Sequence, residues 1–197
     1  MALVLLTGMS ALAWATDGFR VVTSDGAREL EIERSPRPVP DIALVDQDGK
    51  VFSLGSYRGR RVLIEFIYTR CPTICGELGD AFERVLTDWN KDPPSKETDL
   101  LSISFDPNND DTRALKYYGE RFGAAGPRWR IAKPLDQQGL ARLLGVFGVV
   151  VIPDGMGGFV HNAALYLMDR RGRLIRILDP YMPPRQLAAV VSNASAP

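Results

Sequence analysis

The 197-residue sequence has only two cysteines and one histidine, and this scarcity narrows what the chain can do. Without a third cysteine or a second histidine, the chain lacks the four nitrogen and sulfur ligands that a structural zinc site usually takes. The 24 basic residues balance the 24 acidic ones and form no long basic run, so nucleic acid is not an expected partner. No internal repeat is present. What remains is a chain long enough for one domain with a sizeable core, plus small extras.

The N-terminal residues 1–15 are apolar and rich in small side chains, and Ala13-Trp14-Ala15 has the Ala-x-Ala form of a signal-peptidase site. This run is shorter than the roughly 20 residues of a membrane-spanning helix. It also lacks the amphipathic stripe that a buried N-terminal helix would need. We therefore expect an export signal or a truncated membrane anchor. Any membrane association would be made only through this N-terminus, and an exported protein would meet an oxidising compartment.

Residues 16–38 are mixed in character and run into the Pro-rich segment Ser35-Pro36-Arg37-Pro38-Val39-Pro40. Proline favours extended backbone and resists helix, so we predict a linker over residues 16–38. The domain itself is predicted over residues 39–193.

Within the domain, apolar residues alternate between strand and helix patterns. Strands are predicted at Ile42–Val45, Val51–Leu54, Val62–Tyr68, Leu100–Phe105, Trp129–Ala132, Val149–Ile152, Phe159–Met168 and Leu174–Leu178. Helices are predicted to begin close to Cys75, at Asp110 or Asp111, ahead of Leu140 and at Pro184. The pair Asp48-Gly49 between the first two strands indicates an N-terminal hairpin. The order predicts an α/β sandwich with one mixed sheet and helices on both faces.

Both cysteines lie in Cys71-Pro72-Thr73-Ile74-Cys75, between a buried strand and a helix with a strong apolar stripe. Such a strand end is where open α/β sheets usually carry their chemistry. A helix N-terminus lowers the pKa of a thiol and favours the thiolate, which both attacks disulfides and binds soft metals. Redox exchange and metal capture therefore both remain open. Glu65 interrupts the strand before the cysteines, and we expect it to be paired or at an edge.

The single histidine, His161, follows the glycine-rich loop Pro153–Gly158 and lies just inside the strand predicted over Phe159–Met168. A lone histidine is more often structural than a ligand, but this one borders a loop able to move. Two thiolates and one imidazole would form a soft donor set of the kind that Cu(I) accepts. Asp106, Asp154 or Met156 could fill a fourth place, although Asp-Pro commonly ends a strand and Asp154-Gly155 commonly forms a turn.

Four segments make the chain resemble the Sco (SenC) family of thioredoxin-like copper proteins. These segments are Val45–Lys50, Phe66–Cys75, Ser104–Pro107 with Asp111-Thr112, and Val160–Asp169 with Gly172. The resemblance covers about Val39 to Val191. It departs from the family pattern at two places: Gly76 stands where members often have proline, and His161 lacks an acidic neighbour before it.

The resemblance implies a thioredoxin-like three-layer sandwich and a copper ion, Cu(I) or Cu(II), bound by Cys71, Cys75 and His161. It implies a metallochaperone that assists assembly of the binuclear copper site of cytochrome c oxidase. The partners would be the copper-receiving subunit of that oxidase and a thiol reductant protein. The protein would be exported, either periplasmic or anchored in the inner membrane facing the periplasm.

Three alternatives compete with this interpretation. An exported thiol-disulfide oxidoreductase would use Cys71 and Cys75 as its redox pair, although three residues separate them here and thioredoxins have two. A peroxidase of the peroxiredoxin kind would need Thr or Ser three residues before its reactive cysteine, and Tyr68 precedes Cys71 at that distance. A purely stabilising disulfide would close so small a loop that it would contribute little.

Overall fold

The computed structural model describes residues 7–10, 13–14, 16, 24–71, 74–91, 98–124 and 128–194, without the side chains of residues 24–25, 74–75 and 90–91. The strands are β1 (Arg37–Pro38), β2 (Ala43–Asp46), β3 (Val51–Ser53), β4 (Arg61–Ile67), β5 (Thr98–Ser104), β6 (Trp129–Pro134), β7 (Val151–Pro153), β8 (Phe159–His161), β9 (Leu165–Met168) and β10 (Arg173–Leu178). The helices are α2 (Ser24–Arg34), the 3₁₀ helix η1 (Leu54–Tyr57), α3 (Ile74–Lys91), α4 (Thr112–Arg121), α5 (Gln137–Phe147) and α6 (Pro184–Asn193).

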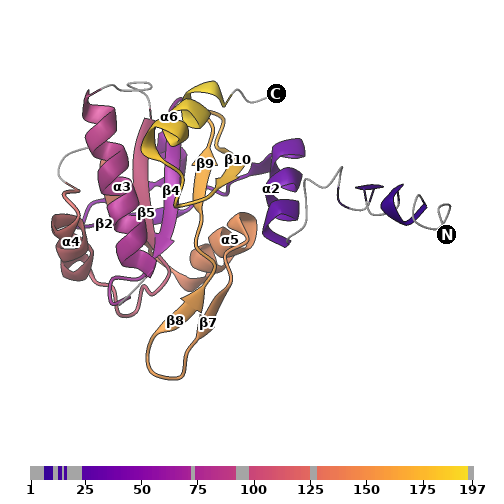
Figure 1. Cartoon of the computed structure of the whole chain (residues 1–197). Coiled ribbons are helices and arrows are strands. Elements are labelled where there is room, and N and C mark those ends of the chain that lie inside the picture. The colour runs from indigo at the N-terminus through magenta and orange to yellow at the C-terminus, as the bar shows by residue number, and fades with distance from the viewer. Residues whose placement is uncertain are drawn as a thin grey trace.

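Eight of these strands form one mixed sheet in the order β1-β10-β9-β4-β5-β6-β2-β3, with β7 and β8 as a separate ribbon (Figure 1). Strands β4, β5 and β6 are parallel to one another, and the other neighbours are antiparallel. All seven residues of β5 are buried, as expected of a central strand covered on both faces. Phe105 N–H also donates to Ile67 O, so the pairing of β4 with β5 continues past the end of both strands.

Helices cover both faces of the sheet, as the sequence predicted. On one face, Phe66 of β4 packs edge-on against Phe147 of α5, with ring centroids 5.2 Å apart. On the other face, Phe82 of α3 packs against Trp129 of β6 at 5.5 Å. Helix α4 lies beside α3, since a Cβ built on Gly79 would meet the ring of Phe122 at 2.7 Å. The fold is therefore a three-layer α/β sandwich (Figure 1).

The predicted N-terminal hairpin is confirmed as the antiparallel pair β2 and β3. Its turn depends on Asp46, whose Oδ1 accepts the N–H groups of Asp48 and Lys50 at 3.1 and 2.9 Å. Gly49 adopts a φ of 77°, in the left-handed region that glycine enters at no steric cost.

The prediction of one strand over Phe159–Met168 is wrong, because this segment forms two strands with different partners. β8 pairs with β7 outside the main sheet, whereas β9 inserts between β10 and β4. Asn162 occupies the junction: its Oδ1 accepts from Val150 N at 2.7 Å and its Nδ2 donates to Gly148 O at 3.0 Å. The side chain thus supplies hydrogen bonds that a continuing strand would have made with its backbone.

Residues 16–38, predicted to be a linker, include the packed helix α2. Ile32 on this helix is buried in the core, and Arg28 donates to Gly148 O at the end of α5 at 3.0 Å. The Pro-rich segment after it is extended as predicted, with β1 on the edge of the sheet. The packed part of the chain therefore begins before residue 39.

Most of residues 1–15, predicted as an export signal or truncated membrane anchor, lies outside the described residues. Among the helices that the structure does describe, none has the length and apolar character to cross a bilayer.

Glu65 lies in the central strand β4 and is completely buried, not at an edge. Its Oε1 accepts a hydrogen bond from Ser102 Oγ at 2.5 Å, and Ser102 Oγ accepts one from Trp129 Nε1 at 2.9 Å. Oε2 has no hydrogen-bond partner among the described residues. Burial raises the pKa of Glu65 to about 8, against the opposing effect of the Ser102 hydrogen bond. At neutral pH the side chain is therefore mainly the neutral acid.

This raised pKa predicts a specific loss of stability with rising pH. An unfolded glutamate ionises near pH 4.5, while the folded protein keeps Glu65 protonated up to a pH of about 8. Between these values Glu65 lowers the free energy of unfolding by up to about 1.4 kcal/mol per pH unit. In denaturant unfolding, Glu65→Gln is expected to gain stability over the wild type progressively from pH 5 to pH 8.

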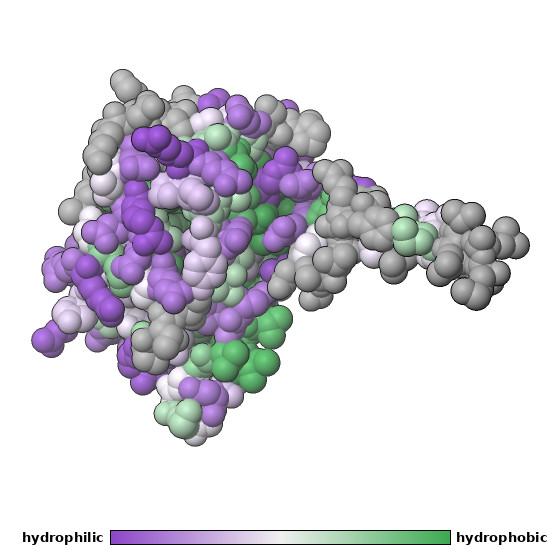
Figure 2. All heavy atoms as spheres, in the orientation of Figure 1, coloured by the Kyte–Doolittle hydropathy of each residue, from purple (hydrophilic) through white to green (hydrophobic). Residues whose placement is uncertain are grey.

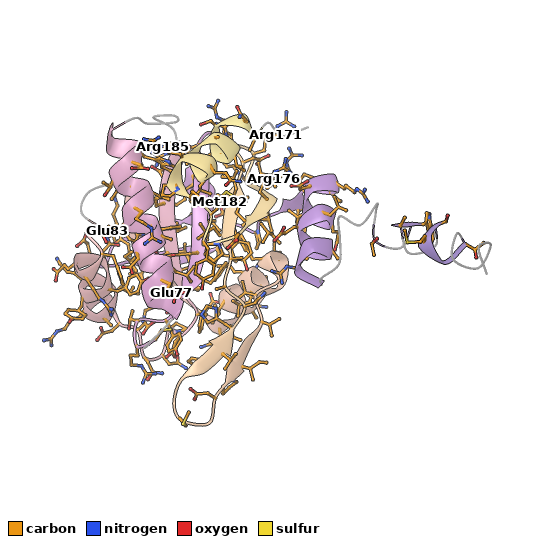
Figure 3. The ribbon with its side chains drawn as sticks, viewed as in Figure 1. Glu77, Glu83, Arg171, Arg176, Met182 and Arg185 are labelled. Carbon is orange, nitrogen blue, oxygen red and sulfur yellow. The ribbon has the colours of Figure 1, made fainter. Side chains whose placement is uncertain are left out.

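The matched control is Glu83→Gln, on the exposed side of α3 (Figure 3), which should show no such growing difference. A Glu65→Gln effect that stays constant across this pH range would contradict an ionisation shift at Glu65.

Candidate functional site

Cys71 lies in a tight turn directly after β4. Its backbone N–H donates to Tyr68 O at 3.2 Å, so that Tyr68, Thr69, Arg70 and Cys71 form one β-turn. Cys71 is buried, with only 8% of its surface exposed. Helix α3 begins at Ile74, so Cys71 precedes the helix, whereas Cys75 belongs to its first turn. The side chain of Cys75 lies outside the described residues.

His161 ends β8 and joins an aromatic cluster that reaches the turn before Cys71. Its ring centroid lies 4.9 Å from that of Phe105, and Phe105 lies 5.4 Å from Tyr68 and 5.6 Å from Phe159. Tyr68 and Phe159 are 5.2 Å apart, which closes the cluster. Residues from the ends of β4, β5 and β8 therefore meet at one place, and His161 and the Cys71 turn share a single packed support.

The His161 ring contacts Phe105 and a neighbouring carbonyl, and the residue before it in the sequence is Val160, where an acidic residue was expected. Nδ1 lies 3.2 Å from Asn162 O. Because a carbonyl oxygen only accepts hydrogen bonds, Nδ1 carries the proton in the neutral ring, and Nε2 is the nitrogen with a lone pair for a metal. Burial lowers the pKa of His161, against the opposing effect of the Asn162 carbonyl.

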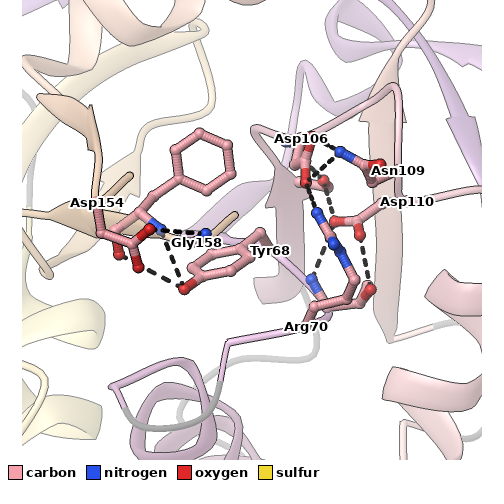
Figure 4. A network of polar contacts seen from close by, with 10 residues as sticks. Tyr68, Arg70, Asp106, Asn109, Asp110, Asp154 and Gly158 are labelled. Carbon is pink, nitrogen blue, oxygen red and sulfur yellow. Dashed lines mark hydrogen bonds and ion pairs between the residues drawn. The ribbon is translucent and has the colours of Figure 1, made fainter. Parts of the chain in front are cut away.

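The three candidates for a fourth ligand sit in very different surroundings. Asp106 is buried, and its carboxylate accepts from Arg70 at 2.9 Å and from Asn109 at 2.8 and 3.0 Å. Asp154 Oδ1 accepts the N–H groups of Met156 and Gly158 within the β7–β8 loop. Met156 is 88% exposed at the tip of that loop. Both carboxylates therefore already have structural hydrogen bonds (Figure 4).

Asp110 is a site-related residue whose role the sequence did not indicate beyond a helix cap. Asp111 makes that cap instead, with its Oδ1 accepting from Ala114 N at 2.8 Å. Asp110 is fully buried and accepts from Thr69 N at 3.0 Å, Thr69 Oγ1 at 2.6 Å and Ser104 Oγ at 2.5 Å (Figure 4). Asp111 thus caps α4, whereas Asp110 accepts hydrogen bonds from the turn before Cys71. Of the two adjacent aspartates, only Asp110 is buried.

The β7–β8 ribbon has two different faces. Ile152 and Val160 are directly opposed in the register and point to the same side, where both are more than half exposed together with Val150. Figure 2 shows the resulting hydrophobic surface over the ribbon. His161 and Phe159 occupy the alternate positions and face the aromatic cluster.

A groove of about 460 Å³ adjoins the inner side of this ribbon. It is lined by Arg28, Glu29, His161–Ala164 and Ile177–Tyr181. Tyr181 at its rim donates through Oη to Glu77 Oε2 at 2.5 Å, and Glu77 lies in the first turn of α3 (Figure 3). This hydrogen bond therefore links the rim of the groove beside His161 with the helix that carries Cys75.

The chain is similar in sequence and in fold to known proteins over most of its length. The SCO1 protein homolog of Bacillus subtilis is 29% identical over 135 residues, which cover 66% of this chain and 68% of that protein. The structure of Bradyrhizobium japonicum ScoI with copper bound superposes with a TM-score of 0.68 at 28% identity, covering 80% of this chain and 99% of that one.

A SCO1/SenC family lipoprotein from Bacillus anthracis superposes with a TM-score of 0.72 at 20% identity, covering 80% of this chain and 96% of that one, a likeness of fold alone. The mixed α/β sandwich is therefore the thioredoxin-like fold of Sco structures, as the sequence predicted. The sequence model of SCO1/SenC matches residues 32–196, which is nearly the whole packed part of the chain, and the protein accordingly belongs to the SCO1/SenC family.

Proposed function

We propose that the protein is a copper-binding metallochaperone that holds a copper ion, Cu(I) or Cu(II), with Cys71, Cys75 and His161. The observation that carries this proposal is the aromatic cluster, in which Phe105 contacts both Tyr68 of the Cys71 turn and the His161 ring. Donors ninety residues apart in the sequence thereby share one support. The donor set suits copper because thiolates and imidazole are ligands that it prefers.

The chemistry of each donor supports the same assignment. Cys75 belongs to the first turn of α3, where the helix N-terminus favours a thiolate. His161 has a lowered pKa, which keeps its ring neutral near pH 7, and its Nε2 is the nitrogen that can ligate. Copper would compete with protons for the thiolates, so binding should weaken as the pH falls.

The proposed destination of the copper is the copper-receiving subunit of cytochrome c oxidase. Bradyrhizobium japonicum ScoI was solved with copper bound, and a disulfide switch was identified in BsSco, a member of the Sco family of cytochrome c oxidase assembly proteins. We propose the same role here, in an exported protein that is periplasmic or held at the inner membrane by its N-terminus.

A disulfide switch would decide when copper can bind. The reduced pair offers two thiolates to copper, whereas a Cys71–Cys75 disulfide offers none. A thiol reductant protein would restore the pair: its thiolate attacks the disulfide to form a mixed disulfide, and its second thiolate then displaces the protein's thiol.

The same cysteine pair supports a second function, thiol-disulfide exchange with a partner protein. The position of Cys75 in the first helical turn favours this chemistry as it favours copper binding. Exchange does not require His161, so this residue separates the two functions.

A copper titration tests the proposal directly. Copper is added to the reduced, metal-free protein and to Cys71→Ser, Cys75→Ser and His161→Ala at one fixed pH, with affinity measured by competition against a coloured chelator. We expect one copper per wild-type chain and a loss of affinity in all three variants, because each removes one donor from a three-donor set. Asp154→Asn and Met156→Leu, in the same series, report whether the β7–β8 loop supplies a fourth ligand.

Met182→Leu is the matched control, since it removes a soft sulfur beside α6 (Figure 3), in a groove whose described lining includes neither Cys71 nor His161. Its affinity should equal that of the wild type. Copper binding unaffected by His161→Ala would reject the three-ligand site and favour the oxidoreductase.

The protonation state of His161 can be measured without copper. Because it is the only histidine in the chain, its ring proton resonance in an NMR titration of the metal-free protein needs no further assignment. Burial disfavours the imidazolium, so the midpoint should fall below the ordinary value of 6.5. The same titration in denaturant provides the unfolded reference, and a folded midpoint at or above it would show that the ring is not desolvated as described.

A further inference from the structure

The turn that contains Cys71 is held by two carboxylates from one neighbouring segment. Thr69 and Arg70 are the two central residues of this turn. Thr69 donates to Asp110 through both N–H and Oγ1, and Arg70 donates to Asp106 at 2.9 Å. Each central residue therefore has its own acidic partner in the segment between β5 and α4 (Figure 4).

Hydrogen bonds also link Asp106 and Asp110 to each other, directly and through Ser104. Ser104 Oγ donates to Asp110 at 2.5 Å and accepts from Asp106 N at 3.1 Å. Asp110 N–H donates to Asp106 O at 2.9 Å, which closes the segment on itself. Since Ser104 ends β5, a fully buried strand between β4 and β6, the segment that holds the turn is anchored to the centre of the sheet.

Burying the Asp110 carboxylate costs folding free energy, which a purely local structural role does not explain. It has no exposed surface, and a buried carboxylate is costly unless charge-assisted hydrogen bonds compensate. Three donors provide that compensation: the backbone N–H and Oγ1 of Thr69 in the cysteine turn, and Oγ of Ser104. The adjacent Asp111 already caps α4 from an exposed position, so capping does not account for Asp110.

The geometry points to Asp110 as a positioning residue, which fixes the Thr69–Cys71 turn so that the Cys71 sulfur is held ready for its partner donors. This inference rests on the proposed copper function and names a residue outside the ligand set. A metal site binds more tightly when its ligands are held by their surroundings, because less order must be imposed on binding. Removing such a support typically lowers metal affinity by about 10- to 100-fold.

The test compares two adjacent substitutions of identical chemistry. Asp110→Asn removes the charge that accepts from Thr69, whereas Asp111→Asn changes only the helix cap. In chelator competition with Cu(I), Asp110→Asn should bind roughly 10- to 100-fold more weakly than the wild type, with Asp111→Asn unchanged. The absorption bands of the Cu(II)-thiolate form should shift in Asp110→Asn alone, which a merely less stable fold would not produce.

A second pair keeps the test valid if Asp110→Asn fails to fold. Thr69→Val removes the hydroxyl donor at nearly constant shape, and Thr69→Ser retains it. Thr69→Val should weaken copper binding in the same direction, and Thr69→Ser should restore most of the affinity.

A copper-independent measurement separates this inference from the proposed function. In a Cys75→Ser background, Cys71 is the only thiol, and its alkylation rate by iodoacetamide reports how firmly the buried turn is held. Asp110→Asn should raise that rate several-fold and Asp111→Asn should not. A wild type that fails to bind copper overturns the proposed function. The positioning role is overturned if Asp110→Asn or Thr69→Val keeps the wild-type affinity, spectrum and alkylation rate. It is also overturned if Asp110→Asn and Asp111→Asn show equal losses.

Discussion

The parallel pairing of β4 with β5 is the constraint on which the rest of the site depends. Because the two strands run in the same direction in register from Arg61 with Thr98 to Ile67 with Ser104, their carboxyl ends leave the sheet together. Parallel strands always deliver their following loops to one edge of a sheet. The Cys71 turn and the Asp106–Asp110 segment are therefore neighbours through strand direction, before any side-chain contact is considered.

Side-chain chemistry then divides this edge into a polar half and an aromatic half. On the polar side, Asp110 and Asp106 hold the cysteine turn through charge-assisted hydrogen bonds. On the aromatic side, Phe105 connects Tyr68 of the turn with His161 of the β7–β8 ribbon. Phe105 thus joins the turn, which follows strand β4 of the sheet, to His161, which ends a strand of the separate ribbon.

The core below the site contains a further polar group of a different kind. Glu65 points to the face covered by α3, where Ser102 and Trp129 form a short hydrogen-bonded chain with it. Its burial costs stability once it ionises, in contrast to Asp110, whose charge is matched by three donors. The two buried acids of this domain therefore differ in the number of hydrogen-bond donors around each carboxyl group.

Sequence pattern alone determined the mixed α/β sandwich, the N-terminal hairpin and the strand-to-helix junction at Cys71 and Cys75, because apolar periodicity and turn residues act over a few neighbouring residues. The choice of Cys71, Cys75 and His161 as ligands also came from the sequence and stays a prediction. Only the tertiary structure decided that Phe159–Met168 splits between two sheets, that α2 packs onto the domain, and that Asp110 rather than Asp111 holds the cysteine turn. Each of these depends on partners far away in the chain, and adjacent residues of the same type carry no local signal of which distant donor they will meet.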